Sequence, residues 1–527
     1  MGFGRTVRSL ALLCALFLLM PVAGAGAAPI VVADPDGTRA VTVDDPALPA
    51  IDQLGSPPPV VAAAPARAAS GPTVPQALDR LAKRGALDRE IAAGYKRDWS
   101  SAVRTAKAIR SWRGGELRAV LANTRAIAAA GLFSASRVPA VMLTVVRNRD
   151  WWKRSPPTPS LRVGGRTRFR DSQIVWQYYG GQGLQIQWLG TFGRANALWS
   201  FGGKDDELEQ LLTEARLLAA ERAGGIAFEY LFQFGGGRPP WVSGLAQATG
   251  LTAFARGALR LSEPTFFADA RSALGIFRTP PPKGVRVSAG EGAHYLQYSF
   301  ARDQRIANGF VQTLNGLRDF ARLADDDPAW RLFASGEKRL RTELSRYDTG
   351  AWTRYEWRGS RPGAESNLEY HKLLTQFVGG LCQRLTEDRD KAAANAAQIQ
   401  ADPGSGGADP SAPAAPERSA YAGRASPSPY CREHERFESY LRTPPKITVT
   451  ARRDRVVIRL SKISGVSAVV RQGRRTLATR SGLLSGGRHA IAVRTKPGAL
   501  TVSVTATDLA GNRASARRTL RVPGSRS

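Results

Sequence analysis

The segment from Tyr347 to His371 holds the residues best suited to acid–base chemistry. It reads YDTGAWTRYEWRGSRPGAESNLEYH, with three tyrosines, three arginines and no long apolar run. A buried phenol or guanidinium needs a hydrogen-bond partner, so this composition is atypical of a protein core. Arginine meets a carboxylate through its planar fork, and tyrosine donates or accepts a proton. The segment therefore predicts a cleft for an acidic ligand.

A second segment, Trp176 to Trp199, combines aromatic residues, glutamines and glycines. Aromatic faces stack on sugar rings, amides bind hydroxyls, and glycine lets the backbone approach a ligand. We expect a saccharide groove here, and an aromatic core patch is the alternative. Farther along, PPWVSGLAQ places Trp241 and Gln247 near a helix start, where they line a cleft mouth or simply accompany a helix cap.

Helical periodicity dominates the elements that must position these residues. Apolar residues at helical spacing predict helices over 207–222, 242–261, 306–323, 330–344 and 431–441. Strand-like patterns cover 138–146 and 228–234. Helix pairs with short β excursions favour a mainly α fold, an α/α-barrel (toroid) catalytic domain with a β-rich N-terminal part. A plain helical bundle fits the same periodicity.

Composition divides the chain into four regions. Residues 1–25 read as a secretory signal peptide, with Arg5 and Arg8 before the apolar stretch and a small-residue cleavage pattern at Ala23 to Ala25. Residues 26–72 are predicted to be a disordered Pro/Ala-rich lead-in, and 73–443 the catalytic domain, with a disordered insert at 392–428. Residues 445–523 alternate in the manner of strands and predict a small β-sandwich. We expect a secreted or cell-envelope protein with no transmembrane segment after signal removal.

Charge and cysteines add two expectations. The net charge is +31, and residues 445–527 carry eighteen Lys and Arg against two acidic residues, a net charge of +16. In an exported protein such a basic surface indicates a polyanion such as a cell-wall polymer rather than nucleic acid, although arginine-rich coding also accounts for it. Signal removal leaves Cys382 and Cys431, which predict a disulfide that staples the last helix of the catalytic domain across the insert. The four histidines are scattered, so no metal site is predicted.

The order of several motifs resembles the C-terminal catalytic region of the D-glucuronyl C5-epimerases, which convert D-glucuronate to L-iduronate in heparan-type polymers. The matching pieces are NGFVQTLNGLRD from Asn308, YDTGAWTRYEWR from Tyr347, EYH at 369–371 and the glutamine-rich QIQ stretch. The ATDLAGN run at 506–512 resembles the end of bacterial immunoglobulin-like modules. The resemblance implies an α/α-barrel with a cleft for an acidic, uronate-containing polysaccharide.

The resemblance also implies roles for individual residues. The paired proton-transfer tyrosines fall on Tyr298 and Tyr370, and their supporting residues on Tyr355 and Arg358. The chain departs from the family at Gln297, where the family has an acid, and at Leu374, where it has a second histidine. The predicted substrate-binding residues, from both lines of reasoning, are Trp176, Tyr178, Gln185, Gln187, Trp241, Gln247, Gln297, Asn308, Tyr347, Asp348 and His371.

Inverting C5 of a uronate requires removing a weakly acidic C–H proton and returning a proton to the opposite face. Two acid/base groups meet this need without a cofactor, because the substrate carboxylate delocalises the charge. A nearby arginine is expected to lower a tyrosine's pKa and neutralise that carboxylate. The leading hypothesis is an exported uronate C5-epimerase. A polysaccharide lyase that uses the same carbanion and a non-catalytic glycan- or cell-wall-binding protein are the alternatives.

Overall fold

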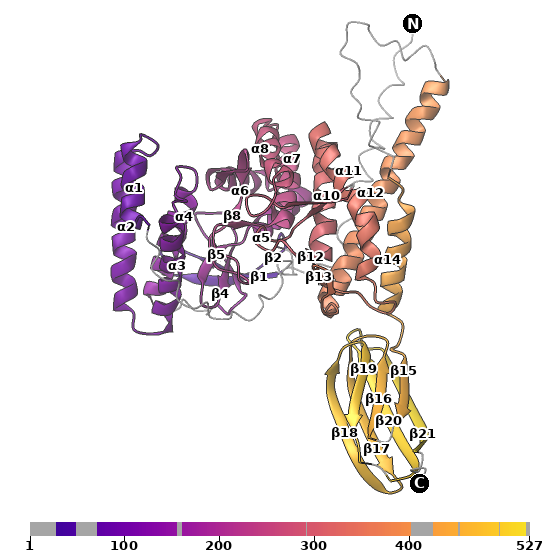
Figure 1. Cartoon of the computed structure of the whole chain (residues 1–527). Coiled ribbons are helices and arrows are strands. Elements are labelled where there is room, and N and C mark those ends of the chain that lie inside the picture. Colours follow the sequence, from indigo (N-terminus) through magenta and orange to yellow (C-terminus); the bar gives the residue numbers. More distant parts are fainter. Residues whose placement is uncertain are drawn as a thin grey trace. The chain divides into compact units, whose positions relative to one another are not determined.

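The computed structural model describes residues 28–48, 71–154, 161–290, 292–401, 425–451, 454–494 and 496–522. The predicted signal peptide, 1–25, lies outside these residues. The chain forms two compact units, Met1–Val242 with Thr249–Gly275, and Ser243–Ala248 with Ile276–Ser527. Figure 1 labels the elements of both. None of the described helices is both long and apolar enough to cross a membrane.

The first unit begins with a sheet where the sequence predicted a disordered lead-in. Strands β1 (Ala28–Ala33) and β2 (Ala40–Asp45) are antiparallel, and β1 also pairs in parallel with β3 (Arg166–Phe169). β4 (Trp176–Tyr179) and β5 (Gly183–Ile186) complete the order β2-β1-β3-β4-β5. The prediction for 26–72 is therefore wrong over 28–48. The prediction failed because it rested on local composition. β1 pairs with a strand more than a hundred residues away, and local composition cannot reveal such a partner.

Helices form the rest of the first unit. Thr73 opens the first helix with a capping box, in which its hydroxyl accepts a hydrogen bond from the Gln76 amide. The helices of this region are α1 (Val74–Lys83), α2 (Arg89–Ala108), α3 (Trp112–Ala129), α4 (Val138–Lys153), α5 (Trp188–Phe201), α6 (Asp205–Leu217), α7 (Gly244–Arg260) and α8 (Thr265–Ala273). α7 crosses the boundary between the two units.

Two predicted strands need correction. Residues 138–146 form the start of α4, because buried Val138, Val141 and Val145 follow a helical spacing and α4 packs on α2 and α3. Tertiary packing thus overrides β-branched propensity. The 228–234 run forms only a two-residue strand, β8 (Glu229–Tyr230), which pairs with β9 (Trp241–Val242). A further hairpin in this region joins β6 (Ala220–Arg222) to β7 (Gly225–Ala227).

The second unit contains the predicted helices at 306–323, 330–344 and 431–441. They are α10 (Ala307–Leu323), α11 (Asp327–Glu343) and α14 (Ser428–Tyr440), and they join α9 (Gly275–Arg278), the 3-10 turn η1 (Leu344–Tyr347) and α12 (Leu368–Ala401). Because α12 continues to Ala401, residues 392–401 are not a disordered insert, and 402–424 lie outside the described residues. The described helices close no barrel, so the expected α/α-barrel is not confirmed.

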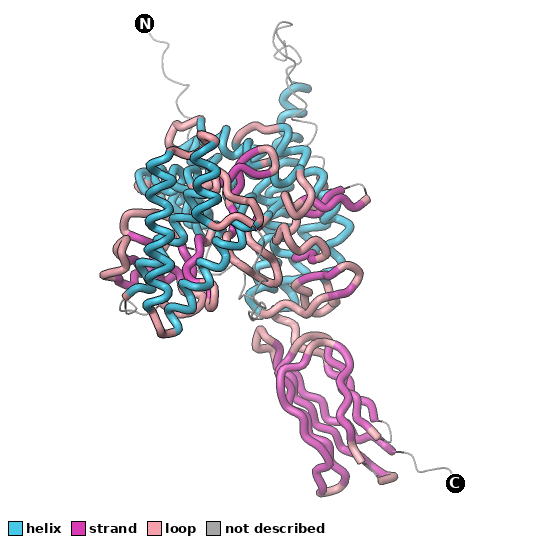
Figure 2. The backbone as a smooth tube through the Cα atoms, turned by 60° about the vertical axis from the view of Figure 1, so that its left-hand side comes forward, coloured by secondary structure: helices cyan, strands magenta, loops and turns pink. Residues whose placement is uncertain are grey.

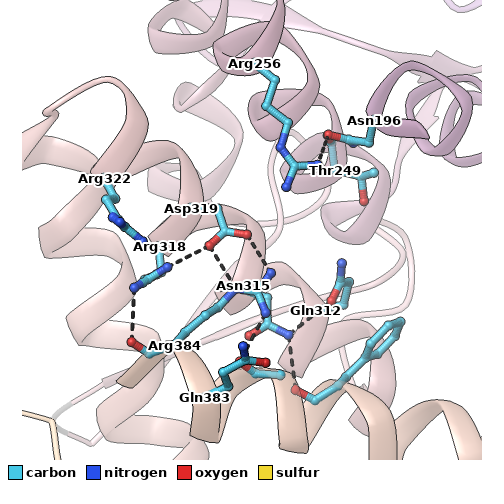
Figure 3. Close-up of polar contacts among 12 residues, drawn as sticks. Asn196, Thr249, Arg256, Gln312, Asn315, Arg318, Asp319, Arg322, Gln383 and Arg384 are labelled. Carbon is cyan, nitrogen blue, oxygen red and sulfur yellow. Dashed lines mark hydrogen bonds and ion pairs between the residues drawn. The ribbon is translucent and has the colours of Figure 1, made fainter. Parts of the chain in front are cut away.

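A disulfide and a buried ion network hold these helices together. Cys382 on α12 and Cys431 on α14 are bonded, as the sequence predicted. Figure 3 shows Arg384 of α12 facing Asp319 of α10, with hydrogen bonds of 2.8 and 2.7 Å. Beside them Arg318 binds both oxygens of Asp388, at 3.0 and 2.5 Å. Two bidentate pairs of this kind set the register of α12 against α10.

Short sheets form in the segments that connect the helices of the second unit. β10 (Arg286–Ala289) pairs with β11 (Gly292–Tyr295). A three-stranded sheet combines β12 (Gln304–Ile306), β13 (Glu356–Arg358) and β14 (Arg361–Pro362). This sheet places Arg305 opposite Trp357, and Ile306 opposite Glu356.

Residues from 447 onward form two antiparallel sheets, the strand-rich region of Figure 2. One has the order β15-β16-β19 and the other β18-β17-β20-β21. They share one apolar core that includes Val456, Ile458, Val470 and Val504. The strands are β15 (Ile447–Ala451), β16 (Arg455–Leu460), β17 (Ser464–Gln472), β18 (Arg475–Leu484), β19 (Gly487–Ala492), β20 (Gly498–Asp508) and β21 (Arg513–Val522).

Candidate active site

Three tyrosines from separate parts of the sequence meet in the second unit. The ring centroids of Tyr355 and Tyr370 lie 4.6 Å apart, and the Tyr355 hydroxyl is hydrogen-bonded to Tyr298. Tyr298 follows β11, Tyr355 precedes β13, and Tyr370 lies in the first turn of α12. We call these residues the tyrosine cluster. The structure thus brings together the three tyrosines to which the family resemblance assigned catalytic roles.

Backbone hydrogen bonds fix the positions of two of these tyrosines. The Tyr355 carbonyl accepts from the Ala307 amide at 3.2 Å, and the Tyr355 amide donates to Ala364 at 3.1 Å, which ties the residue to neighbours on both sides. The Tyr370 amide donates to the side chain of Asn367 at 2.8 Å, an N-terminal cap of α12. The cluster therefore lies where the 355–364 hairpin meets the start of α12.

Burial is the main reason that the Tyr355 phenol stays protonated. Burial is the main cause that raises the pKa of Tyr355 above its ordinary value of 10, and the nearby Tyr370 and Glu356 add to it. The hydrogen bond from Tyr298 and the charge of Arg358 lower the pKa by less. Tyr355 is therefore a proton donor at neutral pH, and it becomes a base only after its proton leaves through a neighbour.

The surroundings of Arg358 differ from those that the sequence predicted. Its side chain is 56% exposed and forms an ion pair with Glu356 at 2.8 Å. Glu356 also accepts a hydrogen bond from Gln304, which stands opposite Arg358 on β12. The expected lowering of a tyrosine pKa by Arg358 is therefore outweighed by burial. The guanidinium remains accessible to a ligand carboxylate. The sequence analysis missed Glu356, although the alternation in Glu356-Trp-Arg358 could have suggested the pair.

Beside Tyr298, buried polar atoms lack protein partners. The Gln297 amide nitrogen donates to the Tyr298 hydroxyl at 2.9 Å, but its Oε1 accepts no hydrogen bond within the described structure. Neither side-chain polar atom of Asn308 has a partner there, although the residue is 2% exposed. Gly309 lets Gln297 approach: a Cβ at 309 would lie 2.3 Å from Gln297 Oε1. The unpaired Oε1 of Gln297, whose amide nitrogen contacts Tyr298, and the unpaired amide of Asn308 are suited to hydroxyls of a ligand.

Three further residues that were predicted to contact the ligand bind protein groups instead. The Tyr347 hydroxyl donates to the Arg305 carbonyl at 3.3 Å. Asp348 accepts from Arg436 and Tyr440, both at 2.9 Å. His371 is fully buried: its ring stacks on Trp352, and its nitrogens contact Thr353 and Phe437. Burial lowers the pKa of His371 to about 4, so the ring is neutral at pH 7.

The glutamine-rich residues of the first unit form a buried network. Tyr178 donates to Glu116 at 3.0 Å, Gln185 donates to the Gln182 carbonyl at 2.6 Å, and Gln187 caps α5 at Gly190. Trp176 is 1% exposed and packs edge-on against Phe169. This arrangement corresponds to the aromatic core patch rather than the open groove, because the amides satisfy one another and the backbone.

The helix-start residues are buried as well. Trp241 stacks on Tyr230 with 4.3 Å between ring centroids, and its indole nitrogen donates to the Phe232 carbonyl at 2.8 Å. Ser243 Oγ accepts from the Ala246 amide at 3.3 Å, the helix cap that the sequence allowed. Gln247 is 0% exposed. Their contacts with a ligand stay predictions.

The part of the chain that contains the tyrosine cluster is similar to known proteins. Residues 222–396 match the family model described as D-glucuronyl C5-epimerase C-terminus. A D-glucuronyl C5-epimerase of Caenorhabditis elegans is 27% identical over 162 residues, which are 27% of this chain and 26% of that protein. The chain thus spans about a quarter of the length of this relative. All three tyrosines lie within the matched residues.

Similarity to solved structures is weak. An endo-β-1,4-glucanase from Acetobacter xylinum is 13% identical, with a TM-score of 0.30 over 41% of this chain and 73% of that one. A GH127 β-arabinofuranosidase is 9% identical, with a TM-score of 0.24 over 86% and 91%. Scores this low assign no fold. Through residues 222–396, about a third of its length, the chain is similar to the D-glucuronyl C5-epimerase C-terminus family.

Proposed function

We propose that the protein inverts C5 of D-glucuronate or a related uronate within an acidic polysaccharide. The observation that carries the proposal is the convergence of Tyr298, Tyr355 and Tyr370 beside unpaired buried amides. Proton removal and return on opposite faces of one ring need two acid/base groups, and this cluster supplies hydroxyls from three elements.

In the proposed reaction, the tyrosinate form of one cluster residue takes the C5 proton, and its O–H bond forms as the C–H bond breaks. The electron pair moves into the substrate carboxylate, which becomes enolate-like and is stabilised by a cation such as Arg358. A protonated tyrosine on the other face then donates its proton to C5. The Gln297 amide favours the ionised form of Tyr298, because it donates to the phenolic oxygen.

The Tyr298–Tyr355 hydrogen bond has a role in this scheme. After one turnover, the abstracting residue is protonated and the donating residue is ionised. A proton moving along that bond begins to restore the starting state without solvent. The raised pKa of Tyr355 fits a connecting role between the two proton-transfer residues, since its phenol stays protonated until substrate binds.

Export and polyanion binding belong to the same proposal. The predicted signal peptide at 1–25 and the Cys382–Cys431 disulfide support an oxidising, extracytoplasmic location. The two-sheet region after residue 447 has the composition and ATDLAGN run of an immunoglobulin-like module. We propose that its basic surface holds the protein on a cell-wall polyanion or on the polymer itself.

The decisive experiment incubates the protein with uronate polymers in heavy water and follows C5 by NMR. Deuterium at C5 without chain cleavage is expected. Unsaturated chain ends would indicate a lyase, in which the carbanion expels the 4-linked sugar. Binding without either change would indicate a glycan-binding protein, an outcome that Gln297 in place of the family's acid makes worth testing.

Tyr370→Phe is the matched variant for this assay. It keeps the ring packed on Tyr355 and removes only the hydroxyl. Deuterium exchange should disappear while polymer affinity stays within a few-fold of the wild type. Unchanged exchange would remove Tyr370 from the mechanism.

A further inference from the structure

A basic pocket of about 110 Å³ lies in the second unit, apart from the tyrosine cluster. Three arginines line it, Arg305, Arg339 and Arg346, together with Asp303, Glu343, Tyr347, Trp357 and Gly359. None of the three cluster tyrosines is among the lining residues. The lining of the pocket is therefore distinct from the tyrosine cluster.

Three elements hold the arginines in place. Arg305 on β12 stands directly opposite Trp357 on β13, so both side chains project from one face of that sheet. Arg339 lies on α11, and Arg346 on η1. The Trp357 indole nitrogen donates to the Arg346 carbonyl at 2.9 Å, and the Tyr347 hydroxyl donates to the Arg305 carbonyl at 3.3 Å. These bonds build a fixed wall for the pocket.

Two acidic residues line the pocket: Asp303 is exposed, and Glu343 is already engaged. One oxygen of Glu343 lies 2.7 Å from His294 Nδ1, and the other accepts from Arg339 at 2.6 Å. His294 is fully buried, and the same contact holds the pKa of Glu343 below its usual value. Glu343 thus hydrogen-bonds to Arg339 and His294, and it acts on Arg305 only through its charge.

The other two arginines form no ion pair in the described structure, although the carboxylates of Glu343 and Asp303 act on the charge of Arg305. Arg305 donates to the Arg302 carbonyl at 2.7 Å, and neither it nor Arg346 forms an ion pair with any residue that the structure describes. Burial is the main cause that lowers the pKa of Arg305, the charge of Arg339 lowers it further, and the charges of Glu343, Tyr347 and Asp303 raise it by less. An anion in the pocket would offset the cost of burying the charge of Arg305 and its repulsion by Arg339.

We propose that this pocket binds one anionic substituent, a carboxylate or a sulfate ester, of an acidic glycan. Guanidinium groups suit either oxyanion, since they offer paired N–H donors, and Trp357 provides an apolar face for the attached sugar ring. The inference rests on the proposed function for its ligand class, because an acidic polymer is the substrate proposed there. It adds a subsite that recognises a second charged unit.

Chain geometry connects this subsite to the tyrosine cluster. Trp357 lies two residues after Tyr355 on the segment that enters β13, a spacing of roughly 7 Å in extended chain. A polymer that presents one uronate to the tyrosines therefore has a neighbouring unit within reach of Arg305 and Arg346. Short substrates without that unit should lose the contact.

Binding of the full chain to three probes tests the proposal by titration calorimetry. The probes are an unsulfated uronate polymer, a sulfated uronate polymer and inorganic sulfate. The variants are Arg305→Met, which keeps an apolar stem, and Arg346→Ala, alone and combined. Arg302→Ala is the charge-matched control, because Arg302 is exposed and does not line the pocket. Thermal unfolding checks that every variant is folded.

The combined variant should weaken binding roughly tenfold or more, the scale of lost charge-assisted hydrogen bonds, while Arg302→Ala changes it only slightly. Whichever polymer loses most affinity identifies the substituent as carboxylate or sulfate. Equal affinities for the combined variant and the control would overturn the proposal, as would a wild type that binds none of the probes. Binding that depends on the pocket without any C5 deuteration would retain the subsite and reject the epimerase function.

Discussion

The phenol ring of Tyr355 lies against that of Tyr370, with 4.6 Å between centroids and 44° between ring planes. The Tyr355 hydroxyl is in turn hydrogen-bonded to Tyr298, which lies more than fifty residues earlier in the chain. Tyr355 is thus the central member of the cluster, in contact with both tyrosines that the family resemblance assigns to proton transfer. We infer that its hydroxyl connects them.

The first prediction concerns that hydroxyl. Tyr355→Phe keeps the ring contact with Tyr370 and deletes the bond to Tyr298. C5 deuterium exchange should fall by about 10²–10⁴-fold, the range for loss of a positioned acid or base. Polymer affinity should change little. The measurement is exchange by NMR beside calorimetric binding, and an equal loss in both would show that Tyr355 only supports the binding surface.

The second prediction concerns the close packing of Gly309 against Gln297, the residue before Tyr298. Gly309→Ala would place a Cβ 2.3 Å from Gln297 Oε1, so Gln297 must shift, and we expect this shift to disturb its hydrogen bond to Tyr298. We expect at least a tenfold loss of exchange and a free energy of unfolding lower by about 1–3 kcal/mol. Kinetics and urea unfolding measure the two effects.

A matched helix glycine provides the control for this variant. At Gly115 on α3, an added Cβ meets only the end of the Arg118 side chain, at 3.9 Å. Gly115→Ala should leave exchange unchanged and stabilise the protein by up to about 1 kcal/mol. Wild-type exchange in Gly309→Ala would mean that the Gln297–Tyr298 bond is dispensable.

The third prediction is a pH dependence of stability. Burial lowers the pKa of His371 from 6.5 to about 4, so the unfolded state binds a proton more readily than the folded state. The stability from the neutral ring is complete above pH 6.5 and is lost as the pH falls toward 4, by about 3 kcal/mol in total. Denaturant midpoints at pH 7 and pH 4.5 measure this loss.

His371→Gln isolates this contribution. The variant should be less stable at pH 7 and should lose less stability on acidification than the wild type. Some pH dependence should remain, because burial also lowers the pKa of His294. His489→Gln, in the C-terminal sheets, is the comparison. An identical acid sensitivity in His371→Gln and the wild type would contradict the assignment.

The fourth prediction concerns the Cys382–Cys431 bridge, which closes a loop with a sequence separation of 49. Replacing both cysteines with alanine should lower the free energy of unfolding by about 2–4 kcal/mol, mainly because the unfolded chain gains entropy. Reductant should reduce the wild-type stability to the same level and leave the double variant unaffected. A wild type insensitive to reductant under unfolding conditions would argue against the bridge.

Local patterns were sufficient for some of the fold. The helices at 306–323 and 330–344 followed from apolar spacing, because each buries one face on a neighbour. The same reasoning failed at 138–146, where valines that favour a strand pack between α2 and α3 as a helix. It also failed at 28–33, whose partner strand β3 is remote in sequence.

The sequence by itself was enough to predict the family resemblance, the disulfide and the three candidate tyrosines, because each depends on residue identity and spacing along the chain. Only the tertiary structure decided what surrounds them. It gave Arg358 an ion pair with Glu356, buried His371 against Trp352, and assembled the arginine pocket from β12, α11 and η1. These outcomes depend on burial and on contacts between distant segments, and a single sequence records neither.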